Sequence, residues 1–163
     1  TAIEGVDKIW DFNTEDNTFA RKGGKIGFID LKGNWIIEPK FKKVKAFFKN
    51  LAPVDENGKW GYINLKGDYV IQPTYDDAEV FGPEGLAPVK EKKWGFIDVT
   101  GKLVIPAKYD ITAASLTSIF KKSEKGFING LARVKSGDQW GFIKTNGEVL
   151  GGKWYKNAEL FKK

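Results

Sequence analysis

The sequence contains no cysteine, no histidine and no methionine. Without cysteine there are no disulfide bonds, no thiolate nucleophile and no zinc site built on thiolates. Without histidine, the commonest general base and the commonest metal ligand are both missing. We therefore expect no metal site, no cofactor and no catalytic residues, and we interpret the chain as not being an enzyme.

Long apolar runs and arginine are also scarce. No apolar run approaches the roughly 18 residues that a membrane-spanning helix needs, so we expect no transmembrane segment. The formal net charge is +6, yet Arg21 and Arg133 are the only arginines. Proteins that read nucleic-acid bases depend on arginine for bidentate contacts, so we expect no specific nucleic-acid binding. A lysine-rich surface instead suits solubility or loose attraction to anionic polymers.

One nine-residue phrase recurs along the chain. It reads KWGFIDVTG from Lys93, KWGYINLKG from Lys59 and QWGFIKTNG from Gln139. A fourth copy, KIGFIDLKG from Lys25, has Ile26 in place of the tryptophan. The central glycines, Gly27, Gly61, Gly95 and Gly141, are separated by 34, 34 and 46 residues. A period of this length indicates a tandem-repeat architecture.

Each unit contains three strand signals bounded by glycine, proline or asparagine. An L-A-x-V segment precedes the phrase at 51–54, 86–89 and 131–134, and Phe19-Ala20-Arg21-Lys22 is expected to replace it in the first unit. A second apolar run follows each turn glycine, and then an aromatic residue: Phe41, Tyr75, Tyr109 and Tyr155. Pro39, Pro73 and Pro106 are expected just after the third strand.

These signals predict an all-β protein. Residues 1–163 are expected to form a single repeat domain of about four short antiparallel β-meanders, centred on Gly27, Gly61, Gly95 and Gly141. An open stack of units is preferred over a closed ring, because 34 residues are few for a four-stranded propeller blade of about 40–45 residues.

The tryptophan beside the glycine has a structural explanation. Side chains alternate across a strand, so Trp94 and Gly95 lie on opposite faces. A glycine at this position makes room for a bulky neighbour or for another backbone. We predict that Trp60, Trp94 and Trp140 are buried between units, and the alternative is an exposed ladder that stacks on a ligand.

The pattern W-G-[FY]-I-[DN], preceded by L-A-x-V and followed by V-I-x-P-x-[YF]-[DK], resembles the WG repeat family of bacterial proteins. The resemblance extends from about Phe19 to Phe161, with departures at Ile26 and at Gly151-Gly152. It implies a β-rich module, often exported or attached to other domains, without an established common activity. We therefore expect an extracytoplasmic or cell-surface location in a bacterium, with a cytoplasmic location as the alternative.

Residues that break the repeat are the candidates for binding. Trp35 and Tyr69 open the third strand where later units have aliphatic residues, and Trp154 stands where other units have Lys40, Thr74 or Lys108. An aromatic residue at a position otherwise held by lysine is expected to face solvent, where it can stack on a sugar or contact a partner. Ordinary partial burial is the alternative.

An insertion within residues 110–130 and a basic run add further candidates. Leu116, Ile119 and Phe120 have the spacing of a short amphipathic helix, followed by Lys121 and Lys122. Such an insertion can bind a partner or merely cover a sheet edge. Lys40 and Lys43 belong to the strongest basic run and form either a solvated face or a patch for an anionic partner.

We predict a non-catalytic binding or scaffolding module whose partner is a protein or an anionic or carbohydrate polymer; self-association through sheet edges is possible. A glycan-active enzyme using carboxylates is the first alternative, since Asp76, Asp77 and Glu79 form the densest acidic cluster. However, Asp76 and Asp110 share their repeat position with lysines, which suggests a solvated linker. A purely structural spacer is the second alternative.

Overall fold

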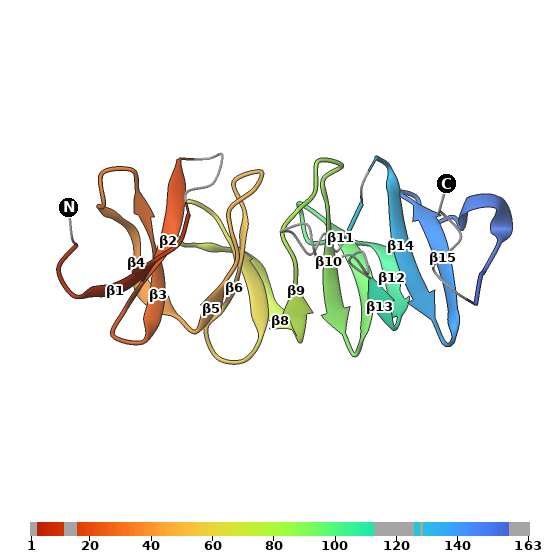
Figure 1. The fold of residues 1–163 in the computed structure, drawn as a ribbon, viewed down its shortest axis with the longest axis horizontal. Coiled ribbons are helices and arrows are strands. Elements are labelled where there is room, and N and C mark those ends of the chain that lie inside the picture. The colour runs from red at the N-terminus through yellow and green to blue at the C-terminus, as the bar shows by residue number, and fades with distance from the viewer. Residues whose placement is uncertain (1–2, 12–15, 113–125, 128, 157–163) are drawn as a thin grey trace. The chain divides into compact units, whose positions relative to one another are not determined.

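A computed structural model describes residues 3–11, 16–112, 126–127 and 129–156 of the chain. It divides into two compact units, Thr1–Val80 and Phe81–Lys163. We describe each unit by itself (Figure 1). Whether residues 1–163 behave as one repeat domain, and whether the repeats form a stack or a ring, stay predictions.

The first unit contains two four-stranded antiparallel sheets, each in chain order. The strands of the first sheet are β1 (Val6–Ile9), β2 (Asn17–Lys22), β3 (Lys25–Asp30) and β4 (Trp35–Phe41). Those of the second are β5 (Lys43–Val44), β6 (Ala52–Asp55), β7 (Trp60–Ile63) and β8 (Tyr69–Tyr75), and a short β9 (Asp77–Ala78) ends the unit. The segment between β4 and β6, expected to be a plain linker, thus supplies a short strand to the sheet that follows it.

The second unit also consists of antiparallel meanders. Its strands are β10 (Leu86–Glu91), β11 (Lys93–Asp98), β12 (Leu103–Tyr109), β13 (Ile111–Thr112), β14 (Leu131–Ser136) and β15 (Gln139–Lys144). The strands β10 to β12 form one meander, and β13, β14 and β15 form a three-stranded sheet. In the last repeat, the third strand is reduced to two isolated bridges, Ile143↔Val149 and Trp140↔Tyr155, with the 3₁₀ turn η1 (Leu150–Gly152) between them. The Gly151-Gly152 pair explains this, because both glycines have positive φ, which a strand does not accommodate.

The predicted all-β fold of tandem antiparallel meanders is confirmed, and no sheet of the described residues closes into a barrel. Two details of the predicted strands were wrong. The first concerns the strand that opens the first repeat: Ala20, not Lys22, takes the place of the repeat's valine, because Ala20↔Gly27 matches Val54↔Gly61. The equivalent of L-A-x-V is therefore residues 17–20, two residues earlier than expected.

The second correction concerns the prolines. Pro39, Pro73 and Pro106 lie inside β4, β8 and β12, not after them. They are tolerated because each strand is irregular there. In β8, the four-residue interval from Ile71 to Tyr75 lies opposite the two-residue interval from Tyr62 to Trp60 on β7. Proline cannot donate to a ladder, so it is confined to sheet edges and bulges.

This irregularity explains the glycine of the repeated phrase. The bulged third strand crosses directly over it, so that a Cβ atom placed on Gly61 would lie 2.6 Å from the Ile71 carbonyl oxygen. The same holds for Gly95 and the Ile105 carbonyl oxygen, also 2.6 Å. At Gly61 and Gly95, the close approach of another backbone is therefore the correct one of the two predicted reasons.

Aromatic and aliphatic side chains form the cores. In the first unit, ring contacts run from Trp10 through Phe19 and Phe28 to Phe47, with centroids 4.7, 6.2 and 4.7 Å apart. The second unit has its own hydrophobic cluster of buried residues: Leu86, Trp94, Phe96, Ile105, Tyr109, Phe127, Ala132, Val134 and Ile143. Burial of this kind is the main force that holds such sheets together.

Two of the three repeated tryptophans are buried as predicted. Trp60 and Trp94 each expose only 6% of their surface. Trp140, in the last repeat, is half-buried. The Arg133 guanidinium lies 4.7 Å and the Lys135 ammonium 5.7 Å from the centroid of the Trp140 ring. A cation over an indole face is attracted to the ring's negative quadrupole.

Candidate binding surface

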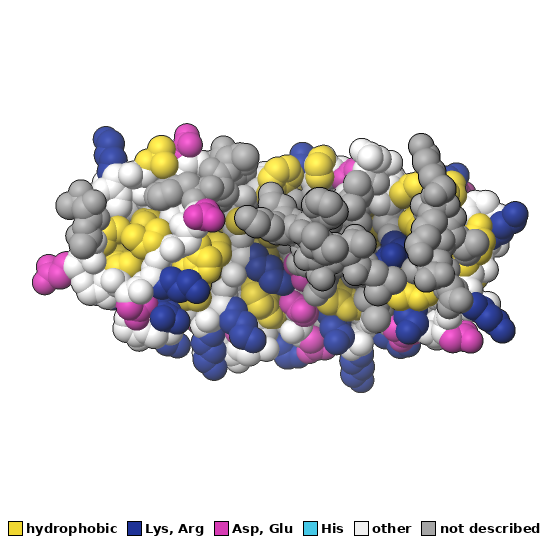
Figure 2. Space-filling view, viewed as in Figure 1, with side chains coloured by type: hydrophobic (Ala, Val, Ile, Leu, Met, Phe, Trp, Pro, Cys, Tyr) yellow, Lys and Arg dark blue, Asp and Glu magenta, His cyan; other side chains and the backbone are white. Residues whose placement is uncertain are grey.

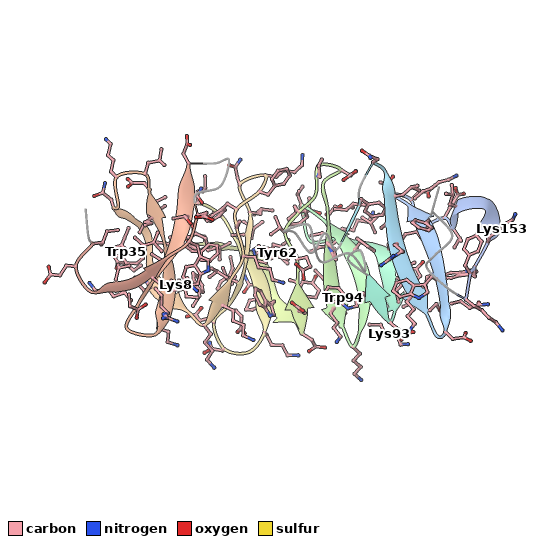
Figure 3. The ribbon with its side chains drawn as sticks, viewed as in Figure 1. Lys8, Trp35, Tyr62, Lys93, Trp94 and Lys153 are labelled. Atoms are coloured by element: carbon pink, nitrogen blue, oxygen red, sulfur yellow. The ribbon has the colours of Figure 1, made fainter. Side chains whose placement is uncertain are left out.

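The structure places the predicted aromatic residues partly inside the fold. Trp35 and Tyr69 open β4 and β8 at equivalent positions, pairing with Ile29 and Ile63, and both are half-buried. Figure 3 shows Trp35 on its outer strand. Tyr69 also packs against the core cluster of the first unit and donates its hydroxyl to Glu56 Oε2 at 3.0 Å. Burial and this bonded carboxylate raise the pKa of Tyr69 to about 12.

Trp154 does not stand free in solvent, as its repeat position had suggested. It is half-buried and packs against the core of the second unit. Its ring covers Gly141, where a Cβ atom would lie 2.9 Å from Trp154 Cε3. Trp154 thus fills the space that the third strand occupies over Gly61 and Gly95. The alternative of partial burial against a neighbouring segment is the one that the structure shows.

The predicted lysines are exposed, and the predicted insertion is not described. Lys40 and Lys43 lie in or beside β4 and β5, with Lys40 Nζ 5.2 Å from the Phe41 ring centroid. The remaining candidates, Ile119, Phe120, Lys121 and Lys122, and the helix expected there, lie outside the described residues. Of the predicted binding residues, the structure therefore brings Trp35 and Lys40 onto one strand and Lys43 close after it.

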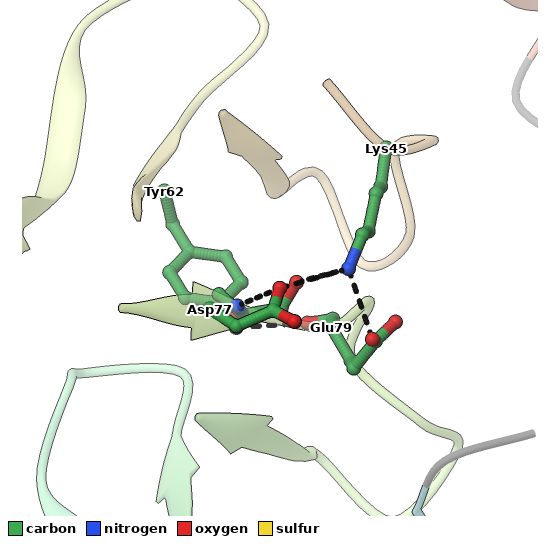
Figure 4. Close-up of polar contacts among 5 residues, drawn as sticks. Lys45, Tyr62, Asp77 and Glu79 are labelled. Carbon is green, nitrogen blue, oxygen red and sulfur yellow. Dashed lines mark hydrogen bonds and ion pairs between the residues drawn. The ribbon is translucent and has the colours of Figure 1, made fainter. Parts of the chain in front are cut away.

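Lys45 pairs with two carboxylates of the densest acidic cluster, those of Asp77 and Glu79 (Figure 4). Lys45 Nζ lies 2.9 Å from Glu79 Oε1, 3.3 Å from Asp77 Oδ1 and 2.7 Å from the Ala78 carbonyl oxygen. The same ammonium lies 4.8 Å from the Trp60 ring centroid. Asp77 Oδ1 also accepts the Ala78 N–H at 2.8 Å. These carboxylates are therefore committed to contacts within the fold.

A tyrosine completes this cluster. The Tyr62 hydroxyl donates to the Glu79 carbonyl oxygen at 2.8 Å, and burial, with Glu79 nearby, holds the pKa of Tyr62 well above its ordinary value. Lys45 and Glu79 are 34 residues apart and so occupy the same position in successive repeats. Their contact joins equivalent points of neighbouring repeats, which favours one stacking register over shifted ones.

A second set of ion pairs repeats with the 34-residue period. Lys59 pairs with Asp76, and Lys93 Nζ lies 2.6 Å from Asp110 Oδ1. Each lysine precedes the tryptophan of its repeat and each aspartate follows the aromatic residue that pairs with it across the sheet. Asp76 and Asp110 are solvent-accessible, as a solvated linker predicts, and each is also paired with a lysine, which the sequence did not predict.

Exposed aliphatic side chains form a surface feature that sequence reasoning missed. They recur at two positions of the repeat: in the turn after the second long strand, and at the second residue of the third strand. Leu31 and Val70 are the most exposed examples, at 61% and 47%. The full set is Leu31, Leu65 and Val99 in the turns, and Ile36, Val70, Val104 and Leu150 after them. Strict alternation along the third strand, with Ile37 and Ile71 pointing inward, is the signal that could have identified them.

Neither a metal site nor a membrane span is found in the part of the chain that the structure describes. No group of three or more acidic side chains there could hold a metal ion. No described helix has the length and apolar character to cross a membrane.

Comparison with known proteins gives one family and a distant structural likeness. The sequence pattern of the family described as WG containing repeat matches residues 26–60, 60–93 and 94–111. No curated protein is significantly similar to the chain. Among solved structures, Hsv2 from Kluyveromyces marxianus has a TM-score of 0.58 at 11% identity, over 96% of this chain and 51% of Hsv2.

Hsv2 from Kluyveromyces lactis gives a TM-score of 0.53 at 9% identity, over 95% of this chain and 52% of that protein. The chain thus spans about half the length of these two structures. At such low identity the likeness concerns the fold alone.

Proposed function

Because the chain belongs to the family of WG-containing repeats, we propose that it is a non-catalytic binding or scaffolding module. Its partner is a protein or a cell-surface polymer, and its location is extracytoplasmic or on the surface of a bacterium. Single exposed apolar side chains are normal on proteins, but recurrence at the same positions of successive repeats is typical of an extended contact surface.

The observation that carries the proposal is the set of exposed aliphatic residues. In the first unit, Leu31 and Ile36 belong to the same hairpin, with Trp35 between them in sequence and Lys40 further along β4. An apolar centre bordered by lysine suits a partner that combines apolar and anionic groups. The inserted segment with Ile119, Phe120, Lys121 and Lys122 belongs to the same proposal.

The arrangement of the acidic residues supports a non-catalytic role. A glycosidase needs two carboxyl groups that reach one substrate from opposite sides. In the densest acidic cluster, Asp77 and Glu79 instead share one lysine, and Asp76 is held by another. These contacts suit a structural role better than a role on a substrate.

Capture from surface extracts tests the proposal. Leu31→Ser combined with Val70→Ser, and separately Trp35→Ala, are expected to lower the recovery of the bound partner about tenfold, as loss of a contact worth about 1.4 kcal/mol would. Gln72→Ser combined with Thr74→Ser, at exposed positions of β8, is the control and should bind like wild type. Circular dichroism checks that every variant is folded.

Equal capture by all variants would contradict the proposed surface. Catalysis has its own test, incubation with bacterial wall fragments and polysaccharides followed by mass spectrometry. A product that disappears with Asp77→Asn would replace the proposal with a glycan-active enzyme.

A further inference from the structure

The first repeat differs from the inner repeats at a pair of positions that elsewhere hold a salt bridge. In the second and third repeats, the lysine before the tryptophan faces the aspartate after the paired aromatic residue, as in Lys93–Asp110. In the first repeat, the corresponding residues are Lys25 and Lys42, which flank the pair Ile26↔Phe41. The strand register is the same as in Trp60↔Tyr75.

The exchange of aspartate for lysine places two lysines at the two positions that form a salt bridge in the inner repeats. Lys25 and Lys42 are both exposed, and Lys25 also pairs across its hairpin with Lys22. With Lys43, these residues form what we call the lysine cluster: Lys22, Lys25, Lys42 and Lys43. Among the residues that the structure describes, none of the four side chains has a carboxylate within ion-pair distance. Lysine and arginine side chains are numerous on the face of the molecule that Figure 2 shows.

Three acidic residues of the first unit, Asp7, Asp55 and Glu56, are engaged in other contacts. Asp7 pairs with Arg21 at 2.7 Å. Asp55, whose backbone pairs with that of Lys43, is buried, and its Oδ1 accepts the Gly58 N–H at 2.5 Å. Glu56 accepts the hydroxyl of Tyr69. The positive charge of the cluster is therefore available to a ligand from outside the chain.

The third repeat shows what kind of anion fits. Asp110 uses both oxygens in different directions: Oδ1 contacts Lys93 Nζ, and Oδ2 accepts the Gly137 N–H at 2.7 Å. In Figure 3, Lys93 lies at the lower end of β10 and β11. Charge-assisted bonds to a planar carboxylate are among the stronger polar contacts in proteins. In the inner repeats, the position opposite the lysine is occupied by the carboxylate of Asp76 or Asp110. The equivalent position in the first repeat is thus suited to a carboxylate.

We propose that Lys25 and Lys42 bind a carboxylate group of an acidic peptide segment on a partner protein, in the place that aspartate fills in the inner repeats. This inference rests on the proposed binding function and names the chemistry of the partner. Lys22 and Lys43 supply further cations for neighbouring carboxylates of the same segment. A run of aspartate or glutamate residues matches such a cluster better than one isolated charge does.

Fluorescence anisotropy with a labelled peptide of eight glutamates tests the inference on the whole chain. Lys42→Asp rebuilds the inner-repeat salt bridge with Lys25 and so fills the site from within. This variant is expected to weaken peptide binding at least about tenfold, because the Lys42 cation is lost and the new aspartate neutralises Lys25. Lys153→Asp, at an exposed lysine of the second unit (Figure 3), changes the net charge equally and should weaken binding less than about threefold.

Lys25→Gln is a second variant that keeps the fold without building a new salt bridge, and we expect it to weaken binding as well. Equal losses for Lys42→Asp and Lys153→Asp would overturn the inference, since only overall charge would then matter. Inorganic polyphosphate of matched charge that binds as tightly, with the same sensitivity to Lys42→Asp, would overturn the choice of an acidic peptide.

The outcomes also separate this inference from the proposed function. Failure of the wild-type chain to bind the peptide, with capture still sensitive to Leu31→Ser and Val70→Ser, would overturn the carboxylate site alone. Peptide binding that requires Lys42, with capture from surface extracts equal for all variants, would support the site and contradict the aliphatic surface.

Discussion

A single repeat position can be occupied by the same residue for different physical reasons. Gly61 and Gly95 are required because the backbone of the third strand lies directly over them. Gly141 is covered by a side chain, that of Trp154, because the last repeat has lost the strand that would cross there. A side chain can move a few tenths of an ångström where a hydrogen-bonded backbone cannot.

We therefore expect Gly61→Ala and Gly95→Ala to lower the free energy of unfolding by more than about 2 kcal/mol, and Gly141→Ala by only about 1 kcal/mol. Urea denaturation followed by tryptophan fluorescence measures the three variants. Similar losses at all three positions would show that the neighbouring atom does not decide the cost.

Two buried tyrosine hydroxyls offer a matched comparison. The Tyr62 hydroxyl is bonded to the Glu79 carbonyl oxygen, whereas the Tyr109 hydroxyl is buried with no hydrogen-bond partner among the described residues. Burial raises the pKa of Tyr109, which keeps this hydroxyl uncharged at neutral pH.

Tyr62→Phe is expected to lower the free energy of unfolding by about 1 kcal/mol, because a satisfied buried hydrogen bond is lost. Tyr109→Phe is expected to leave stability unchanged or to raise it by up to about 1 kcal/mol, since an unpaired polar atom is removed. Chemical denaturation of both variants distinguishes these results. A clear loss for Tyr109→Phe would mean that its hydroxyl has a partner in solution.

At the scale of the element, the hairpin turns between the second and third long strands share one device. The side-chain oxygen of Asp30, Asn64 or Asp98 accepts two backbone N–H groups of its own turn, two and four residues later. The turn glycine, for example Gly67 with φ of 85°, then takes the left-handed conformation that glycine alone adopts easily. Aspartate and asparagine are thus equivalent acceptors here, but only aspartate titrates.

This difference predicts a pH dependence. Bonds from the Thr100 hydroxyl and from two backbone N–H groups hold the pKa of Asp98 below its ordinary value. A lowered folded-state pKa means that the contribution to stability is present above about pH 4 and disappears as the pH falls through the folded pKa. Asp98→Asn, which copies the turn of the second repeat, should lack this dependence.

Urea midpoints of wild type and Asp98→Asn between pH 7 and pH 2.5 provide the measurement. We expect the wild-type midpoint to fall relative to that of the variant below about pH 4. Asp30 titrates in both proteins and cancels in the comparison. A difference that stays constant over the whole range would contradict the assigned role of the carboxylate.

The elements also show how far the sequence could be interpreted. The repeat period, the strands and the turn glycines were visible because they depend on local alternation and on φ. The short β5 and the register of β2 were not, since both depend on pairing with strands elsewhere in the chain. For the same reason the ion pair of Asp76 was not predicted: its partner, Lys59, lies 17 residues away and is reached only through the strand register.

At the scale of the whole molecule, the sequence period runs without interruption from one compact unit into the next, since Gly61 and Gly95 are 34 residues apart. Repeat proteins gain stability from each unit and from each junction between neighbours. If residues 1–163 form the single repeat domain that the sequence predicts, a substitution that destabilises the first unit must also lower the stability of the second.

Hydrogen exchange on Gly61→Ala tests this expectation. We expect the amides of β11, in the second unit, to lose protection together with those of β7, in the first. Lys153→Ala, an exposed substitution, is the control and should leave both sets unchanged. Unaltered protection of β11 in Gly61→Ala would show that the two halves unfold independently.

The short strand β5 follows β4 directly in the chain yet pairs with β6, so each sheet of the first unit begins before its sequence motif does. A fragment that began at the L-A-x-V segment of the second repeat would therefore lack β5, the first strand of its own sheet. For building longer arrays, the natural splice point lies between β4 and β5, because the 34 residues 43–76 contain all four strands of the second sheet, β5 to β8. Cassettes joined there should extend the molecule without any newly designed junction.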